Sequence, residues 1–291
     1  MGELYALLCA VVWAAAVIFL KRSGESVPPF ALNLFRVAIS SVLLVITVFA
    51  AGQGLVRDAP LADYLILVAS GVIAIAAADT MLHRGLNIVG AGVMAIIDCL
   101  YSPMVIAFAF LLLDERLSGY HLAGMALIIG GVLLTSRVEL PQGLDRGELI
   151  RGILWKVGSV IALALGVVIA KPVLERSPVL WATTVRQLGA LLVLLIATVA
   201  TPRRGEILAV FRPRATWRFT LPATLLGSYL SLILWLAGMK YTLAGSAAIL
   251  NQTSTIFILV FATIFLREAF TRRKFVAAAL AICGILLVTL F

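Results

Sequence analysis

The chain has 291 residues, of which 63% are hydrophobic and only 13% are charged. A soluble domain carries roughly 25% charged residues, so this composition excludes an ordinary water-soluble enzyme or binding module. The net charge of +9 lies in short segments between apolar runs and forms no basic stripe, which argues against a nucleic-acid partner. Such a distribution is typical of a membrane protein, whose Lys and Arg residues stay on the cytoplasmic side.

Apolar runs of about 17–25 residues, the length that spans a hydrocarbon core of roughly 30 Å, recur along the chain. Most of them are separated by turn-forming or charged segments such as Pro28-Pro29 and residues 141–146. We therefore expect an all-α integral membrane protein with ten transmembrane helices. In chain order, the predicted spans are residues 4–20, 30–51, 61–82, 89–113, 118–136, 152–170, 179–200, 219–239, 243–266 and 275–291.

The two halves of the chain resemble each other. Residues 113–134 and 266–287 align without gaps and share eight identities in 22 positions, among them Glu115 with Glu268. Apolar helices match easily by chance, but matched polar residues are harder to explain in that way. The sequence therefore indicates an internal duplication.

The duplication predicts two domains, residues 1–145 and 146–291, each with five spans. An offset of 150 residues pairs Arg36 of the first half with Arg186 of the second. Because five is an odd number, the second half must enter the membrane from the opposite side. The result is an inverted repeat around a central cavity, which many secondary transporters use to build one site between two gates.

Each five-span half has a Leu-x-Glu near the end of its fourth span and a glycine-rich fifth span. In this it resembles the repeated unit of the drug/metabolite transporter superfamily. More narrowly, it is similar to the EamA-like ten-helix members, through the matching stretches 87–134 and 241–289. The resemblance covers nearly the whole chain and is almost silent on the substrate. It implies that helices 1–4 and 6–9 surround the cavity, with helices 5 and 10 outside. It also implies secondary transport by alternating access.

The orientation in the membrane has two competing indications. If the loops are numbered in chain order, the odd loops carry fifteen Lys or Arg residues and the even loops carry five. The positive-inside rule then places the odd loops in the cytoplasm and both termini outside. The family resemblance implies instead that both termini are cytoplasmic. In either orientation, we expect a multi-pass protein of the plasma (inner) membrane.

Asp98 is the clearest candidate for a functional side chain. It lies about nine residues into its predicted span, roughly 13 Å at 1.5 Å per residue, and therefore close to the bilayer midplane. Tyr101 and Ser102 follow at i+3 and i+4 and share its helical face. A charge at this depth lines a cavity, or it is capped by hydroxyls or paired with an Arg. Asn251 and Thr255 replace Asp98 and Ser102 in the second half, so acid-dependent chemistry would belong to one half only.

Asp79 and His83 lie four residues apart on the third span and face the same way. A carboxylate beside an imidazole can hold a proton near neutral pH. The alternative is that water or lipid headgroups satisfy His83 at the end of the span. The spacing suggests no third metal ligand, so we expect no metal here.

Three basic residues lie inside predicted spans. Arg36 and Arg186 are two turns into their spans, where they can contact an anion or clamp helix-end carbonyls or Asp98. Lys156 begins the sixth span and can reach inward. Lys21, at the end of the first span, is expected to snorkel toward the membrane surface.

Further candidates for the cavity wall come mainly from the second half. The five polar side chains from Asn251 to Thr255 cannot all face lipid, so at least some of them face protein or water. They either form polar contacts between helices or contact the substrate. Trp13, Tyr229 and Trp235 are plausible aromatic walls, with a core or membrane-facing role as the alternative.

These patterns favour a transporter over an enzyme. No nucleotide-binding loop, Ser-His-Asp constellation or zinc motif is present in the sequence, so we expect no catalytic residue, no metal and no cofactor, with proton coupling left open. The basic candidates outnumber the acidic ones, which favours an anionic or zwitterionic metabolite such as an amino acid. We expect a monomer or homodimer that exports such a substrate. The alternative is an intramembrane enzyme or lipid-handling protein that uses Asp98, Asp79 and His83 for acid–base chemistry.

Overall fold

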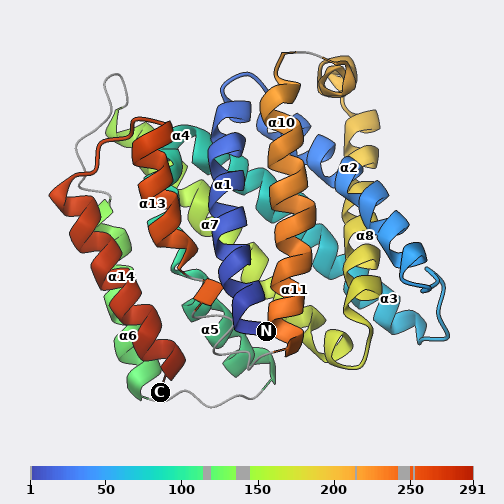
Figure 1. Ribbon diagram of the computed structural model, residues 1–291, viewed down its shortest axis with the longest axis horizontal. Coiled ribbons are helices and arrows are strands. Elements are labelled where there is room, and N and C mark those ends of the chain that lie inside the picture. Colours follow the sequence, from blue (N-terminus) through green and yellow to red (C-terminus); the bar gives the residue numbers. More distant parts are fainter. Residues whose placement is uncertain are drawn as a thin grey trace.

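The computed structural model describes residues 2–113, 119–135, 145–213, 215–241, 250–251 and 253–290. Over these residues the secondary structure is helical, with no strand (Figure 1). The elements are α1 (Gly2–Gly24), α2 (Pro29–Ala50), α3 (Leu61–Gly71), η1 (Val72–Ala77), α4 (Ala78–Asp98), α5 (Tyr101–Leu113), α6 (Gly119–Thr135), α7 (Arg146–Glu175), α8 (Val179–Ala200), α9 (Arg204–Leu208), η2 (Ala209–Phe211), α10 (Trp217–Thr224), η3 (Leu225–Leu230), α11 (Ser231–Tyr241), α13 (Ser254–Phe265) and α14 (Arg272–Leu290).

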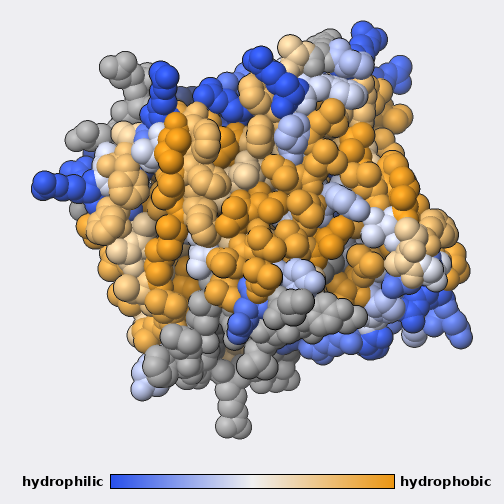
Figure 2. All heavy atoms as spheres, in the orientation of Figure 1, coloured by the Kyte–Doolittle hydropathy of each residue, from blue (hydrophilic) through white to orange (hydrophobic). Residues whose placement is uncertain are grey.

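Helices suited to a membrane make up most of this structure. Among the described residues, five helical stretches are long and apolar enough to cross a bilayer: α1, α2, the continuous stretch Leu61–Asp98, α7 and α8. A broad apolar band runs across the molecule between hydrophilic margins (Figure 2). Val42, Ile46 and Phe49 illustrate it, since they share one face of α2 and each is 58% exposed. Lipid rather than water suits such a surface.

Two helices contain π-helical turns at matching places. The segments η1 and η3 are both six residues long, and they begin 153 residues apart, at Val72 and Leu225. The same offset relates residues 113–134 to residues 266–287. Since π-turns leave backbone groups without their usual helical partners, they occur often at functional sites.

Side chains satisfy the backbone groups that these turns release. Asn33 of α2 donates from Nδ2 to the carbonyls of Ile75 and Ala76, at 3.0 and 3.1 Å. In the second half, the Ser231 hydroxyl donates to the Gly227 carbonyl at 2.7 Å. The two turns are therefore held in place by built-in hydrogen bonds.

The fourth predicted span, residues 89–113, is interrupted twice, which a continuous apolar run does not reveal. Gly90 has φ 80° and ψ 171°, a conformation reserved for glycine, so α4 breaks there. Cys99 and Leu100 form a turn that separates α4 from α5. The Asp98 side chain consequently lies at a helix end, and Tyr101 starts a new helix instead of continuing the face of Asp98.

Charged side chains from other elements hold the break at Gly90. Lys21 does not snorkel outward as expected; its Nζ donates to the carbonyls of Leu86 and Asn87, at 3.1 and 2.8 Å. From the loop after α13, the Glu268 carboxylate accepts hydrogen bonds from the backbone N–H groups of Ala91 and Gly92. The carbonyls before the break and the amides after it therefore each have a charged partner.

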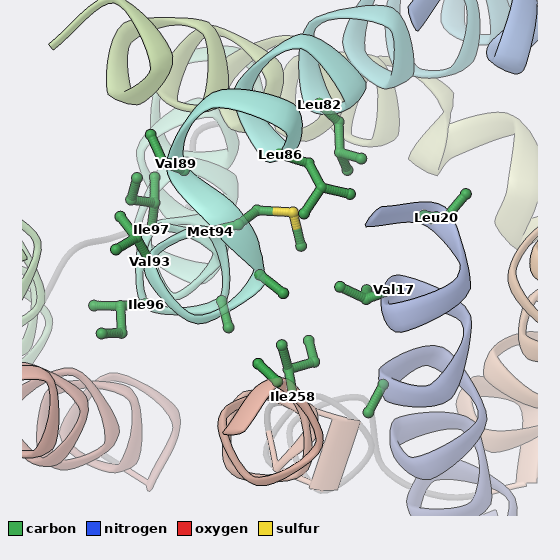
Figure 3. Close-up of a cluster of buried hydrophobic side chains, with 14 of the residues drawn as sticks. Val17, Leu20, Leu82, Leu86, Val89, Val93, Met94, Ile96, Ile97 and Ile258 are labelled. Carbon is green, nitrogen blue, oxygen red and sulfur yellow. The ribbon is translucent and has the colours of Figure 1, made fainter. Parts of the chain in front are cut away.

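A cluster of buried apolar side chains packs α4 against its neighbours (Figure 3). The cluster includes Val17 and Leu20 of α1, Leu86 and Met94 of α4, and Ile258 of α13, and in Figure 3 Val17 points toward Met94. All five are at most 1% exposed. This packing joins α1 and α4 to α13.

The helices α6 and α14 pack against each other at one edge of the molecule (Figure 1). Glycines allow this close approach: a Cβ atom on Gly131 would lie 2.7 Å from the Ala277 carbonyl oxygen, and one on Gly284 would lie 2.6 Å from that of Gly124. Small residues at such contacts are a common means of packing membrane helices. The N- and C-terminal ends both lie in the lower part of Figure 1.

Candidate functional site

A cavity of about 250 Å³ lies where segments of both halves converge, and both π-turns contribute to its wall. Pockets for drug-sized ligands have roughly 300–1,000 Å³, so this one suits a small molecule. The structure places eight of the sequence-predicted residues on the wall. These are Trp13, Arg36, Asp79, Asp98, Tyr101, Arg186, Trp235 and Asn251.

Arg36 is the centre of one buried polar cluster. Its Nη1 lies 2.6 Å from His83 Nε2 and 3.6 Å from Asp79 Oδ2. A guanidinium only donates hydrogen bonds, so His83 Nε2 accepts and the ring carries its proton on Nδ1 as the neutral tautomer. His83 is fully buried behind the wall, because the helix continues past it and does not end there. The alternative that water or lipid headgroups satisfy His83 is therefore wrong.

Asp98 forms the second buried pair, with Lys156 of α7. The Lys156 Nζ lies 2.5 Å from Asp98 Oδ1, and the Lys156 side chain is 1% exposed while that of Asp98 is 22% exposed. The carboxylate thus faces the cavity and its cation lies behind it. The suggested clamp between Arg36 and Asp98 does not form, since each of the two groups has a different partner.

Arg186 differs from Arg36, its counterpart in the repeat. It is 94% buried and on the wall, yet within the described residues no ion pair or hydrogen bond of its side chain is present, and its Nε is unsatisfied. The hydroxyl oxygen of Thr183 and the amide oxygen of Asn251 are also buried wall atoms without a hydrogen-bond partner there. All three belong to the second half. The Nε of Arg36 in the first half is also unsatisfied, but its guanidinium already contacts His83 and Asp79 through Nη1.

Two other predicted residues, Tyr229 and Thr255, lie away from the wall. The Tyr229 hydroxyl pairs with Thr47 Oγ1 at 2.8 Å, because its place in η3 turns it toward α2. Thr255 is buried beside Cys99, at 3.5 Å from its sulfur, and fills space between helices. The Ser102 side chain lies outside the part of the chain that the structure describes.

The sequence prediction missed several polar wall residues, chiefly Gln187, Ser228 and Ser231. Gln187 donates from Nε2 to Ser40 Oγ at 2.6 Å and so connects α8 to α2. A helical-spacing test could have found it, since Thr183, Arg186 and Gln187 lie at i, i+3 and i+4 on α8.

Comparisons with known proteins agree with this architecture. No curated protein matches the chain. A crystal structure described only as "Crystal structure of protein" superposes with a TM-score of 0.70 at 17% sequence identity, covering 99% of this chain and 96% of that one. At this identity the likeness shows the fold alone. The model of the EamA-like transporter family matches residues 1–137 and 150–290, so the chain belongs to that family and is a multi-pass membrane transporter of the drug/metabolite transporter superfamily.

Proposed function

We propose that the protein is a secondary transporter of the plasma membrane that exports a small polar metabolite by alternating access. The observation that carries this proposal is the small cavity between the two halves, with buried charges on its wall. A charged side chain inside a membrane protein is costly, and it is typically kept where a substrate or ion passes. In this proposal the cavity is the substrate site, and access alternates between its two sides.

The proposed architecture has ten spans in two inverted units, residues 1–145 and 146–291. The matching positions of η1 and η3 support it, because a duplicated backbone feature is harder to obtain by chance than matched apolar residues. The interruptions on either side of Asp98 also support it. Discontinuous helices near the midplane are a recurrent means of binding substrate in inverted-repeat transporters.

The charges of the cavity favour an anionic or zwitterionic metabolite such as an amino acid. Arg36, Lys156 and Arg186 bring three positive charges, Asp79 and Asp98 bring two negative ones, and His83 is neutral. The two carboxylates are also the candidate proton carriers for coupling to a proton gradient. An intramembrane enzyme is less suited to this geometry, since His83 Nε2 is engaged by Arg36 and both carboxylates are paired.

The test is a thermal-shift screen of the purified protein, followed by counterflow in proteoliposomes. The screen covers amino acids, nucleotides, vitamins and quaternary amines, and each stabilising compound is then radiolabelled. We expect counterflow of at least one of them in unmodified form. Chemical conversion of a compound, or stabilisation by several compounds without counterflow of any, contradicts secondary transport.

A further inference from the structure

We infer that the second half of the chain carries a carboxylate-binding site, in which Arg186 and Thr183 bind the carboxylate and Asn251 accepts a hydrogen bond from a second polar group of the same molecule. The inference rests on the proposed transport function and assigns its substrate to the monocarboxylates. It also assigns carboxylate binding to the second half alone, because the charges of Arg36, Asp79 and Asp98 in the first half are already paired.

The first argument is that the two duplicated arginines, Arg36 and Arg186, have different neighbours. Arg36 has Asp79 and His83 as neighbours, at 3.6 and 2.6 Å. The offset that relates the π-turns places Leu232 at the position that corresponds to Asp79. The second half thus kept the guanidinium of Arg186 and holds no acid at that position. Over the described residues, Arg186 has no carboxylate partner.

The second argument is the set of unsatisfied polar atoms on the wall. A buried polar atom without a hydrogen bond is unfavourable. Besides Arg36 Nε, whose guanidinium has other partners, three such atoms lie on wall residues of the second half, and together they indicate groups that can bind a ligand. Arg186 and Thr183 are three residues apart on α8 and therefore share its cavity face. A guanidinium matches the two oxygens of a carboxylate, and a hydroxyl can donate to either of them. The Asn251 amide oxygen is free to accept from an ammonium or hydroxyl group.

The third argument is the charge balance, which limits the ligand to one negative charge. With three cations, two carboxylates and a neutral His83, the cavity has one positive charge in excess. A monocarboxylate neutralises it. A phosphate monoester, with about two negative charges at pH 7, would leave one in excess next to the carboxylates of Asp79 and Asp98. The ligand class is therefore a small carboxylic acid that also carries a hydrogen-bond donor.

The first experiment needs no ligand, and it uses Arg36 as the matched control. In the apo protein, Arg186→Met removes a buried cation that has no carboxylate partner in the described part of the chain, so we expect an unchanged or higher melting temperature. Arg36→Met leaves the Asp79 carboxylate without its cation, so the melting temperature should fall by several degrees. An equal fall in both variants would mean that Arg186 is a structural clamp, and it would overturn the inference.

The second experiment measures binding with a panel of L-amino acids and their matched carboxamides, which keep the shape but lack the negative charge. We expect the wild type to be stabilised by free acids and not by carboxamides. The apparent affinity should fall at least tenfold in Arg186→Met and severalfold in Thr183→Val, the latter of which keeps the size of the side chain. Equal binding of acids and carboxamides, or unchanged affinity in both variants, would also overturn it.

These outcomes are separable from those of the transport test. Counterflow of a quaternary amine without any stabilisation by carboxylates supports transport and overturns the carboxylate site. Arg186-dependent stabilisation by free acids without counterflow supports the site and contradicts transport.

Discussion

Glu268→Gln tests the contact that holds the broken helix α4 in place. The carboxylate of Glu268 accepts from the Ala91 N–H at 2.7 Å and from the Gly92 N–H at 3.1 Å. Gln presents one carbonyl oxygen in place of two carboxylate oxygens, so one amide is faced by an NH₂ group that cannot accept. The variant therefore loses one charge-assisted hydrogen bond and weakens the other.

The expected loss follows from the partly buried position of this carboxylate. Hydrogen bonds to charged groups contribute about 1.5–3 kcal/mol each, and an exposed one contributes less. The Glu268 side chain is 19% exposed and also lies 3.3 Å from Lys274, so we take about 2 kcal/mol. For a chain of 291 residues, that corresponds to a fall in melting temperature of roughly 3–4 °C.

The assay is tryptophan fluorescence of the purified protein during a thermal ramp. Glu206→Gln, which changes an exposed carboxylate on α9, is the matched control and should shift the melting temperature by less than about 1 °C. Gly90→Ala should destabilise through the same site, since its Cβ would lie 2.7 Å from Glu268 Oε1 and its φ is 80°. Wild-type melting temperatures in both Glu268→Gln and Gly90→Ala would refute the capping role.

Three further predictions address packing, charge pairing and orientation. Gly284→Val should destabilise the α6–α14 contact by about 1–3 kcal/mol, whereas Gly130→Val, whose Cβ meets nothing within 4 Å, should leave the melting temperature unchanged. Lys156→Met should cost about 3 kcal/mol, the lower end for a broken buried pair because Asp98 is 22% exposed, and adding Asp98→Asn should recover most of it; a double variant no more stable than the single one contradicts the pairing. A cysteine placed in residues 201–218 of a cysteine-free variant should resist a membrane-impermeant thiol reagent in intact cells; rapid labelling would instead support cytoplasmic termini.

The apolar pattern predicted where helices lie but not where they break. Spans such as residues 4–20 and 179–200 correspond closely to α1 and α8. The predicted span 89–113 contains two breaks, which the length of an apolar run cannot indicate because it carries no information about backbone dihedral angles. Gly90 was the available indication, because a glycine within an apolar run often marks a kink. The positions of the π-turns have no composition signature, so only the structure could reveal them.

For the site, the sequence predicted which charged side chains lie in the membrane but not which of them pair. The sequence identified Arg36, Asp79, Asp98 and Lys156 as membrane-embedded charges that need partners. Which cation meets which carboxylate depends on how α2, α4 and α7 pack, and spacing along one helix carries no information about that. The pairs Arg36–Asp79 and Lys156–Asp98 consequently had to come from the structure.

The halves share backbone features but differ in charge, and the difference has a physical consequence for the proposed inverted repeat. The π-turns and the arginine of the second span occur twice, so both sides of the cavity can be built by the same local geometry. Asp79 and Asp98 occur once, and Leu232 and Asn251 stand at the matching places. A site with acids in both halves would pair every cation internally and leave none for an anionic ligand. Since the second half holds no acid at these positions, Arg186 has no carboxylate partner among the described residues, whereas Arg36 and Lys156 are each paired with one. A cation available on one side of the cavity fixes the orientation of a ligand that has one charged end.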